Sequence, residues 1–583
     1  MFLITTPIKE SWPTKNQEIV FLGEWCKLYE DRKILKDLKS HTVDYHWNDR
    51  KKLKKDFDYL NFLFEKTIPL IATKLNTIHK VNYTTKYWKL ILGPWLMVFI
   101  SATYDRWESI RLCFKNFSPS KTVELTYKLE DMIPICMQDF SKKIETDEWN
   151  HYIYSEIINY NDDDIFIEKI NKDNFFNSKH KIEINLKKKL LKYCRSFILS
   201  IFQLPSIFSK IFIYQSYLGR KDLIKLNLKL NQIPYFDQTK DNYKKTYDKE
   251  NFRSWDLLEN NSIKNFENFL YKNISKHVPS SYLENYNFIN KLASKKFWPK
   301  NPKIIFTSNA HYMDETFKFW MASKVVNFNS KLFIGQHGGH WGQGLFNFTE
   351  NYEIAISDKF LSWGWSSKKN VFPTGMLKPL INKSKNTKKE KLIFILLGTD
   401  RYSHNIQSIP ISSQWVDYFD NQISLVHNLK KKIKNNIHFK PYSHDYKWLQ
   451  AERLNDCLNF DSFKIIDQSK KYHDIFKNCR LTISGWNSTT FLETMASNIP
   501  TIIFWDENYF ELRESAKNDF EVLKKAKIFF SNPNEAAKHI NEIWENVDLW
   551  WYNIDTVEAK NFFLNKYANK ADFLNKIAKE LKH

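Results

Sequence analysis

Glycine is concentrated in one short turn of this chain. The 583 residues include only 12 glycines, and five of them lie between residues 335 and 344. Glycine adopts positive φ angles and lets a ligand or a second backbone segment come close, at a cost in conformational entropy. The turn follows the apolar run 332–334, which predicts a buried strand, and it contains His337 and His340. Because open α/β sheets bind ligands at the carboxyl ends of their strands, we interpret it as a ligand-binding loop; a tight turn with buried histidines is the alternative.

Strands and helices alternate from residue 303 onward. Short apolar runs predict strands, and helical spacing separates them, with one expected helix at 314–322. This alternation indicates parallel sheets. The expected strands are 303–309, 332–334, 354–358, 360–364, 392–397, 437–441, 463–467, 481–485 and 501–505.

A polar segment divides the predicted strands into two groups. Residues 381–391 offer almost nothing to bury after Ile381, which is typical of a linker. We therefore predict an α/β protein with two Rossmann-like domains that face a cleft. The N-terminal domain covers residues 1–380, with strands at 2–6 and 19–22 and a helical insertion over about 40–300. The C-terminal domain covers residues 392–583.

Two stretches of the predicted insertion have helical patterns. Apolar residues recur at helical spacing over residues 53–64. The apolar stretch 87–96 is too short to cross a bilayer, and we expect a core helix that is broken at Gly93-Pro94. The end of the chain, residues 562–581, is also predicted to be helical.

The net charge of +22 suits a polyanionic partner, either nucleic acid or an anionic membrane surface. Lysine and asparagine are abundant throughout, so composition alone is an alternative explanation. No nucleic-acid-binding signature occurs, and we expect no nucleic-acid partner. In the segment 187–213, basic residues precede an apolar run. This segment is a candidate for anionic headgroup binding, although a core helix with a solvated basic shoulder is the favoured interpretation.

Cysteine usage and the absence of targeting signals indicate the compartment. Six cysteines lie far apart with no Cys-x-x-Cys pair, which is typical of a reduced cytosol and argues against structural zinc. The first residues lack a signal-peptide pattern, and no run of eighteen uncharged apolar residues appears. We expect a cytoplasmic protein without a transmembrane helix, and peripheral attachment to the inner face of the plasma membrane remains open.

The segment 483–496 has the pattern of a phosphate site. A strand, a polar turn and a hydroxyl-rich helix start follow one another, and free N–H groups at a helix start bind phosphate. Glu493, one turn into the helix, is placed to accept a hydrogen bond from a ribose hydroxyl. The alternative is a capping box made by Thr490 and Glu493, which needs no ligand. The candidate nucleotide-binding residues here are Ser484, Gly485, Asn487, Ser488, Thr489, Thr490 and Glu493.

These motifs resemble a known group of enzymes. The segment 483–505, the Gln336-His337-Gly338 turn and Lys440-Pro441 are similar to those of GT-B-type glycosyltransferases, and of UDP-N-acetylglucosamine 2-epimerase-like and CDP-glycerol transferase-like proteins. A more particular signature resembles the transferase family first noted in Leptospira O-antigen clusters, and that likeness runs nearly end to end. It consists of Tyr45-His46-Trp47, Asp49-Arg50, Asn76 with His79, and the stretch from Tyr87 to Trp95.

The resemblance implies a GT-B-like fold and roles for particular residues. The segment 483–496 becomes the nucleotide-sugar donor site, and Lys440 and Arg401 face the donor phosphates. His337 lies across the cleft, and the cluster 44–50 joins the acceptor side. Tyr442 stands where relatives often carry a histidine after the proline, so this chain departs from their pattern there.

The resemblance leaves two mechanisms open. An inverting transferase needs a general base, for which His337, His311, Asp314 and Asp49 are candidates. A retaining enzyme would instead stabilise the leaving phosphate through Lys440, Arg401 and the helix start. We expect no metal and no bound cofactor. Asp44, His46 and Asp49 can imitate a metal trio, but an ion-paired cluster is favoured.

The function predicted from the sequence is transfer of a sugar from a nucleotide-sugar to a surface glycan, of O-antigen or capsule type, or to its lipid-linked form. Two alternatives remain. One is a nucleotide-sugar epimerase or glycerol-phosphate transferase on the same fold, and the other is a non-catalytic membrane-surface scaffold that binds glycan.

Overall fold

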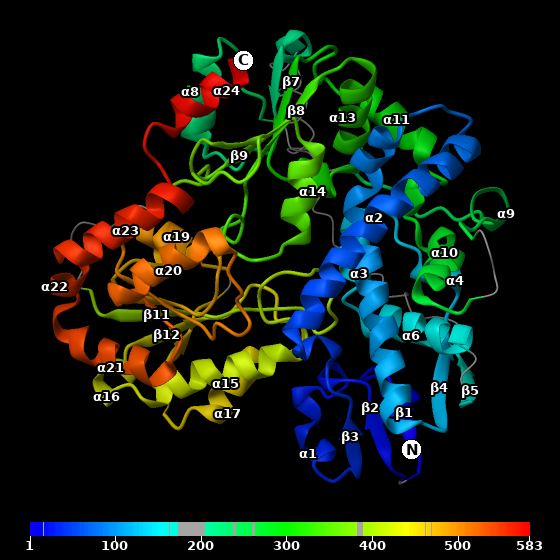
Figure 1. Cartoon of the computed structure of the whole chain (residues 1–583), viewed down its shortest axis with the longest axis horizontal. Helices are drawn as coiled ribbons and strands as arrows, with labels where there is room; N and C mark the ends of the chain where they lie inside the picture. Colours follow the sequence, from blue (N-terminus) through cyan, green and yellow to red (C-terminus); the bar gives the residue numbers. More distant parts are fainter. Residues whose placement is uncertain are drawn as a thin grey trace, which may run out of the picture.

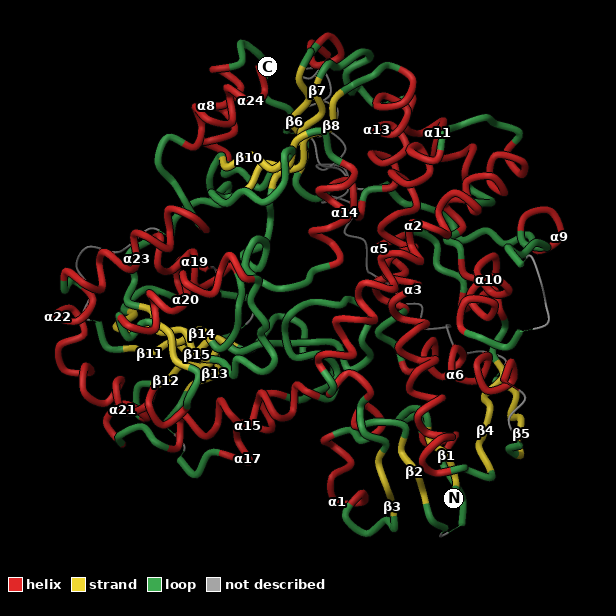
Figure 2. Tube along the Cα trace, in the orientation of Figure 1, coloured by secondary structure: helices red, strands yellow, loops and turns green. Residues whose placement is uncertain are grey.

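A computed structural model of the chain contains three separate parallel sheets (Figures 1 and 2). It describes residues 1–15, 17–161, 164–172, 204–236, 241–258, 263–381, 389–460, 462–467, 469–470 and 472–582. The α/β class with parallel sheets is confirmed, because every pair of neighbouring strands in the three sheets is parallel.

The N-terminal sheet has the strand order β3-β2-β1-β4-β5. Its strands are β1 (Phe2–Ile4), β2 (Ile19–Phe21), β3 (Ser40–Thr42), β4 (Lys121–Thr126) and β5 (Phe166–Asn171). The helices of this part are α1 (Arg32–Leu35), α2 (Arg50–His79), α3 (Thr85–Phe117), α4 (Leu129–Met132), α5 (Met137–Lys143) and α6 (Asp147–Asn161). The long helices α2 and α3 pack side by side and connect this sheet to the middle of the molecule (Figure 1).

The middle sheet has the order β10-β9-β8-β7-β6. Its strands are β6 (Ile211–Ile213), β7 (Ile304–Thr307), β8 (Lys331–Gly335), β9 (Lys359–Ser362) and β10 (Val371–Pro373). The helices of this part are α8 (Arg220–Lys229), α9 (Lys249–Phe252), α10 (Phe266–His277), α11 (Tyr286–Ser294), α12 (Ala310–Met313), α13 (Glu315–Asn327) and α14 (Phe348–Ile356).

The C-terminal sheet has six strands in the order β13-β12-β11-β14-β15-β16. They are β11 (Lys391–Ile395), β12 (Ile437–Lys440), β13 (Lys464–Ile465), β14 (Cys479–Ser484), β15 (Thr501–Phe504) and β16 (Phe529–Phe530). Helices cover both faces (Figure 1). They are α15 (Gln414–His427), α16 (Lys431–Lys434), α17 (Gln450–Cys457), α18 (Tyr472–Ile475), α19 (Thr489–Ala496), α20 (Glu514–Lys525), α21 (Pro533–Ile543), α22 (Val547–Trp551) and α23 (Ile554–Tyr567).

The last helix, α24 (Phe573–Lys582), returns to the middle sheet and lies beside α8 (Figure 1). Ile577 and Leu581 pack in one core cluster with Phe333 of β8. Lys359 Nζ lies 2.8 Å from Glu580 Oε2. This agrees with the helical end expected from the sequence and ties the end of the chain to the N-terminal half.

The predicted helical insertion over about 40–300 needs a correction. That range contains strands β4, β5 and β6 as well as helices, so the first 380 residues build two sheets. The pattern was hard to see because β6 has only three residues and β5 is mostly polar and exposed. Among the described residues the middle and C-terminal sheets share no strand. Residues 382–388 of the expected linker lie outside the described residues.

Two local predictions are wrong. The helix expected to break at Gly93-Pro94 continues as α3 through Phe117. Gly93 leaves room there for the ring of Tyr352, whose hydroxyl donates to the carbonyl of Lys89 at 3.0 Å, so packing against α14 supports the helix at the proline. The strand expected at 354–358 belongs largely to α14, because the Asn347 side chain caps this helix.

The C-terminal part contacts both sheets of the N-terminal half. Arg50, at the start of α2, forms a two-nitrogen ion pair with Glu511. The loop that follows β8 in the middle sheet reaches the C-terminal part through an isolated antiparallel bridge between Gly344 and Leu512. Loops of all three parts therefore meet at the carboxyl edge of the C-terminal sheet.

The basic-apolar segment 187–213 and the helix lengths bear on contact with a membrane. Residues 187–203 of the basic-apolar segment lie outside the described residues. Within the described part of the chain, every helix is too short or too polar to cross a bilayer.

Candidate functional site

A pocket of about 770 Å³ opens at the carboxyl edge of the C-terminal sheet. We call it the sheet-edge pocket. Ile395 and Lys440, the last residues of β11 and β12, form its floor together with the start of α19. Tyr217 and the segment 378–381 from the middle part form its other wall. The pocket therefore lies where open parallel sheets bind ligands.

Lys440 lies in this pocket as the sequence predicted. It lines the pocket, and burial lowers the pKa of its ammonium group. Among the described residues, no carboxylate lies within ion-pair distance of it. A half-buried cation that no protein anion neutralises favours an anionic ligand.

The start of α19 supplies hydroxyl groups and free N–H groups to the same pocket. Thr489 and Thr490 both line it. Ser488 is the N-cap, and its side chain accepts from the N–H of Thr490 at 3.1 Å. Because Ser488 rather than Thr490 caps the helix, the alternative of a capping box between Thr490 and Glu493 is wrong. Glu493 instead lies 3.3 Å from Lys378 Nζ and lines the pocket.

The turn before α19 is fixed by its own contacts. Ser484 Oγ donates to the carbonyl of Trp486 at 3.2 Å. The N–H of Gly485 donates to the carbonyl of Ile395 at 2.9 Å, and a Cβ there would lie 2.7 Å from the hydroxyl of Tyr418. Ser484 and Gly485 therefore position the turn from behind, outside the lining of the sheet-edge pocket.

Arg401 does not face this pocket. Its guanidinium is buried and donates to Asp147 Oδ1 and to the carbonyl of Trp25, both at 2.7 Å. It also donates to the carbonyl of Tyr446 at 3.0 Å. The loop after β11 turns toward the N-terminal sheet, so this cation is used to join two parts of the molecule.

The glycine-dense turn after β8 touches the start of α19. The N–H of Gly339 donates to Thr489 Oγ1 at 3.0 Å. A Cβ on Gly339 would lie 2.5 Å from the carbonyl oxygen of Ser488. A Cβ on Gly338 would overlap the ring of Trp341 at 1.7 Å. The glycines therefore serve close approach between the middle and C-terminal parts.

His337 lies beside a buried carboxyl group. Its Nδ1 is 3.6 Å from Glu353 Oε1, and its ring centroid is 4.7 Å from that of Trp341. Burial lowers the pKa of His337, and burial raises the pKa of Glu353 to about 7. His311 also contacts Glu353, at 3.2 Å, and burial lowers its pKa to about 3, so this imidazole is neutral.

The other candidate acids are helix caps. Asp314 caps α13 by accepting from the N–H of Phe317 at 3.0 Å, and it also accepts from the hydroxyl of Tyr214. Asp49 caps α2 by accepting from the N–H groups of Lys51 and Lys52. Like His337, neither residue lines the sheet-edge pocket, and both carboxylates are already used as helix caps. Their positions do not support the catalytic role expected for them.

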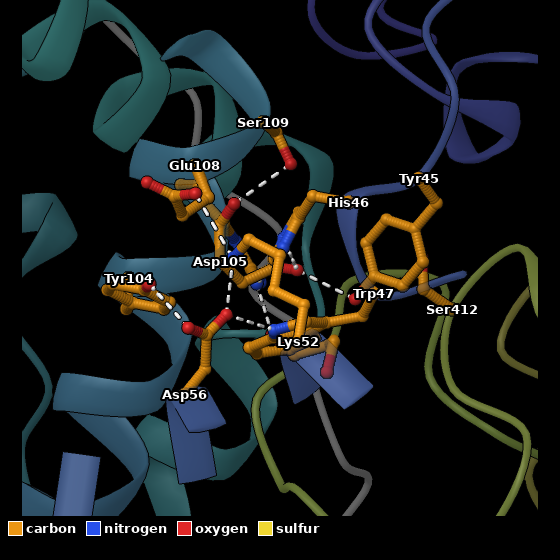
Figure 3. Close-up of polar contacts among 12 residues, drawn as sticks. Tyr45, His46, Trp47, Lys52, Asp56, Tyr104, Asp105, Glu108, Ser109 and Ser412 are labelled. Atoms are coloured by element: carbon orange, nitrogen blue, oxygen red, sulfur yellow. Dashed lines mark hydrogen bonds and ion pairs between the residues drawn. The ribbon is translucent and has the colours of Figure 1, made fainter. Parts of the chain in front are cut away.

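The cluster around residues 44–50 is an internal network (Figure 3). Tyr45 and His46 both contact Asp105 Oδ1, at 2.7 and 3.1 Å, and Trp47 Nε1 donates to Asp56. Of the three residues that could imitate a metal trio, His46 bonds to Asp105 and Asp49 caps α2. Among the described residues, no group of three or more His, Cys, Asp or Glu side chains is arranged to hold a metal ion. Residues 44–50 line neither the sheet-edge pocket nor the second pocket described next. Their position therefore does not support the role in acceptor binding that the resemblance implies.

A second pocket of about 410 Å³ adjoins the first, and we call it the interdomain pocket. Tyr442, Trp486 and Thr489 line both. Its walls come from α3, the α5–α6 loop, the glycine turn and the loop after β11. The cleft predicted between domains is thus present, and its deepest polar groups come from different parts of the chain.

Two carboxyl groups in the interdomain pocket were missed by sequence reasoning. Asp400 follows β11, and Glu145 lies between α5 and α6. Burial raises the pKa of Asp400 to about 7, and burial and then Asp400 raise the pKa of Glu145. Asp400 lies in a turn that is visible in the sequence, but only the adjacent Arg401 had an expected role there. The sequence next to Glu145 and Glu353 does not indicate a site, because the residues that surround each of them in the structure lie far along the chain.

The fold and the pockets define an α/β protein with a pocket at the carboxyl edge of a parallel sheet, between parts of the chain. A family model described as LIC12162 family transferase matches residues 1–581, and the chain belongs to that family. No curated protein matches it in sequence.

Several solved structures share part of the fold. A UDP-N-acetylglucosamine 2-epimerase from Listeria monocytogenes has 11% identity and a TM-score of 0.31, over 51% of this chain and 78% of the epimerase. S. aureus MnaA, solved with UDP, has 10% identity and a TM-score of 0.33 over 51% and 78%. Spinosyn rhamnosyltransferase SpnG has 10% identity and a TM-score of 0.29 over 52% and 80%. At these TM-scores the similarities carry no functional argument.

Proposed function

We propose that the protein is a glycosyltransferase that moves a sugar from a nucleotide-sugar to a glycan acceptor. Membership of a transferase family supports a group-transfer enzyme. The observation that carries the proposal is the sheet-edge pocket, in which the unneutralised cation Lys440 faces the same space as the start of α19.

The donor's diphosphate belongs at the start of α19. The N–H groups of a helix start and the helix dipole favour negative charge, and the hydroxyls of Thr489 and Thr490 add donors. Lys440 adds a charge-assisted contact. Glu493 accepts from a ribose hydroxyl through the carboxylate oxygen that Lys378 leaves free.

The transferred sugar then lies toward the interdomain pocket, because Thr489 and Trp486 line both pockets. An acceptor hydroxyl attacks the anomeric carbon, the new C–O bond forms, and the bond to the diphosphate breaks with its electron pair on the leaving nucleotide. We assign the hydroxyl proton to His337, which lines neither pocket itself but directly precedes Gly338 and Gly339 in the lining of the interdomain pocket. Burial keeps this imidazole neutral and able to accept a proton, and Glu353 stabilises the imidazolium that results.

Nucleotide binding tests the donor site. A thermal-shift panel of UDP, GDP, CDP, dTDP and CMP identifies the nucleotide, and calorimetry then compares the wild type with Lys440→Ala. We expect a loss of about 10-fold to 100-fold in affinity, since a charge-assisted hydrogen bond is removed. Lys464→Ala, an exposed lysine on the neighbouring strand β13, is the matched control and should bind normally.

Product analysis separates transfer from epimerisation. NMR of the nucleotide-sugar incubated with the enzyme should show no epimer, and release of the nucleoside diphosphate should require an acceptor glycan. An epimer formed without acceptor would replace the proposal with an epimerase. Failure of every nucleotide to bind would argue for the scaffold.

A further inference from the structure

The interdomain pocket contrasts in charge with the rest of the protein. Lys and Arg account for 88 of the 583 residues, and the net charge is +22. The described residues that line this pocket nevertheless include no lysine and no arginine, whereas Glu145 and Asp400 both line it. The adjoining sheet-edge pocket carries Lys378 and Lys440. The two halves of the cleft therefore differ in the charge that they accept.

The nearby basic groups do not neutralise the interdomain pocket. Burial lowers the pKa of His340 and of His404 to about 4, so both imidazoles are neutral near pH 7. His444 lies 2.9 Å from Glu145 Oε2, at the exposed side. Arg106 is fully buried, donates to Asp105 and Asn150 and does not line the pocket, although its charge partly offsets the effect of burial, which raises the pKa of Asp400. An anionic group entering the pocket would meet two carboxyl groups and no lysine or arginine side chain in the described lining.

Several residues that line this pocket carry buried polar atoms without a hydrogen-bond partner in the described part of the chain. Asn487 is 1% exposed, and among the described residues neither its amide nitrogen nor its amide oxygen has a hydrogen-bond partner. The same holds for Trp486 Nε1 and Asp400 Oδ1. Buried polar atoms are usually paired, so unpaired ones in a pocket wall indicate a ligand. This set mixes donors and acceptors, which fits hydroxyl groups because a hydroxyl both donates and accepts.

Aromatic rings complete the lining. Trp341, Tyr442 and Trp486 are each half-buried and border the pocket. Ligand pockets typically combine apolar and aromatic surface with a few placed polar groups. A volume of about 410 Å³ with this lining suits a ring that is apolar on its faces and hydroxylated at its edge.

We propose that the interdomain pocket takes an uncharged, hydroxyl-rich sugar ring and rejects a ring that carries a carboxylate or phosphate. The proposal rests on the transferase function proposed above and adds the substrate class. The ring comes either from the donor or from the acceptor glycan. Asp400 and Glu145, in their ionised forms, set the selectivity by like-charge repulsion, while Asn487 and Trp486 bind the hydroxyls.

The donor arm of the test compares UDP-glucose with UDP-glucuronate, which differ only in a CH₂OH group against a carboxylate. Calorimetry on the wild type at about pH 8.5, above the pKa of about 7 to which burial raises Asp400, should show UDP-glucose binding at least about 10-fold more tightly, because like charges repel strongly in a desolvated pocket. In Asp400→Asn combined with Glu145→Gln the ratio should fall below about 3-fold, with affinity for UDP itself unchanged. GDP-mannose and GDP-mannuronate replace this pair if GDP binds better than UDP.

The acceptor arm compares maltotriose with trigalacturonate, with and without nucleotide. Selectivity in the first arm assigns the pocket to the donor's sugar, and selectivity in the second assigns it to the acceptor. Glu148→Gln is the matched control. Burial raises the pKa of Glu148, as it does for Glu145, but Glu148 does not line the pocket. This variant should leave both affinity ratios unchanged.

Equal binding of neutral and acidic sugars in both arms would overturn the proposal, and so would selectivity that survives in the double variant. Failure of UDP and of every other nucleotide to bind would instead count against the transferase function. In that case the comparison of the two trisaccharides without nucleotide still tests the charge selectivity proposed for the interdomain pocket.

Discussion

The backbone N–H of Gly339 donates a hydrogen bond to Thr489 Oγ1 at 3.0 Å. This bond joins the turn after β8 to the first residue of α19, so the middle and C-terminal parts meet at the proposed diphosphate site. Thr489 borders both pockets. The site therefore requires the two backbones to lie close together at this point, and this close approach requires glycine at position 339.

Substitution of Gly339 by alanine should separate these two parts. The new Cβ would lie 2.5 Å from the carbonyl oxygen of Ser488, a backbone atom that cannot rotate away. We expect a loss of about 1–3 kcal/mol in the free energy of unfolding, measured by urea denaturation, together with weaker nucleotide binding.

Gly219→Ala is the control for that experiment. Its Cβ would meet nothing closer than 3.7 Å, and its φ of −61° suits alanine. It should unfold like the wild type. A Gly339→Ala variant as stable as Gly219→Ala would show that the close approach is not needed.

The two cations assigned to the donor phosphates should behave in opposite ways. Arg401→Ala removes a buried ion pair with Asp147 and should lower the free energy of unfolding by about 3 kcal/mol. Lys440→Ala should weaken nucleotide binding and leave stability nearly unchanged. Urea denaturation and calorimetry on both variants give the comparison. An Arg401→Ala protein that is stable but cannot bind nucleotide would reverse our assignment.

Much of the fold could be predicted from apolar runs. Strands β7, β8, β11, β14 and β15 are short and almost wholly buried, β12 alternates buried with partly buried residues, and the runs of all six are visible in the sequence. The strands of the N-terminal sheet beyond β2 could not be recognised, because β5 is largely exposed and its polar residues resemble a loop. Gly93-Pro94 was misjudged because the support from Tyr352 comes from α14, more than 250 residues away in the chain.

The candidate site could be predicted where one motif carries several of its groups. The segment around Ser488 and Lys440 lies at the sheet edge as expected. Arg401 could not be placed, because the partner that decides its orientation, Asp147, belongs to another part of the molecule. Asp400 and Glu145 face a common pocket only after α5 and the loop after β11 come together.

Loss of His337 should affect turnover more than folding. His337→Ala should bind nucleotide normally yet transfer sugar at least about 100-fold more slowly, since general acid–base catalysis typically contributes that much. Glu353→Gln should reduce the rate less, because the imidazole remains. Single-turnover kinetics on both variants provide the test. Near-wild-type turnover by folded His337→Ala would remove it from the mechanism.

The buried carboxyl of Glu353 should make stability depend on pH. Its pKa rises to about 7 in the folded protein from an ordinary value near 4.5, so the folded state holds a proton that the unfolded state has released. Its contribution is fully present below about pH 4.5 and is lost as the pH rises through about 7. Glu353→Gln should therefore gain stability relative to the wild type between pH 5 and pH 8. Urea denaturation across this range should show the change, and a difference that is constant with pH would contradict it.

The central claim is that the carboxyl edge of the C-terminal sheet binds the donor's diphosphate. A crystal structure with the nucleoside diphosphate that gives the largest thermal shift tests it most directly. We predict phosphate oxygens within hydrogen-bond distance of Thr489 and Thr490 and of Lys440 Nζ, with the nucleoside in the sheet-edge pocket. A nucleotide bound elsewhere, with Lys440 still unpaired, would contradict the account.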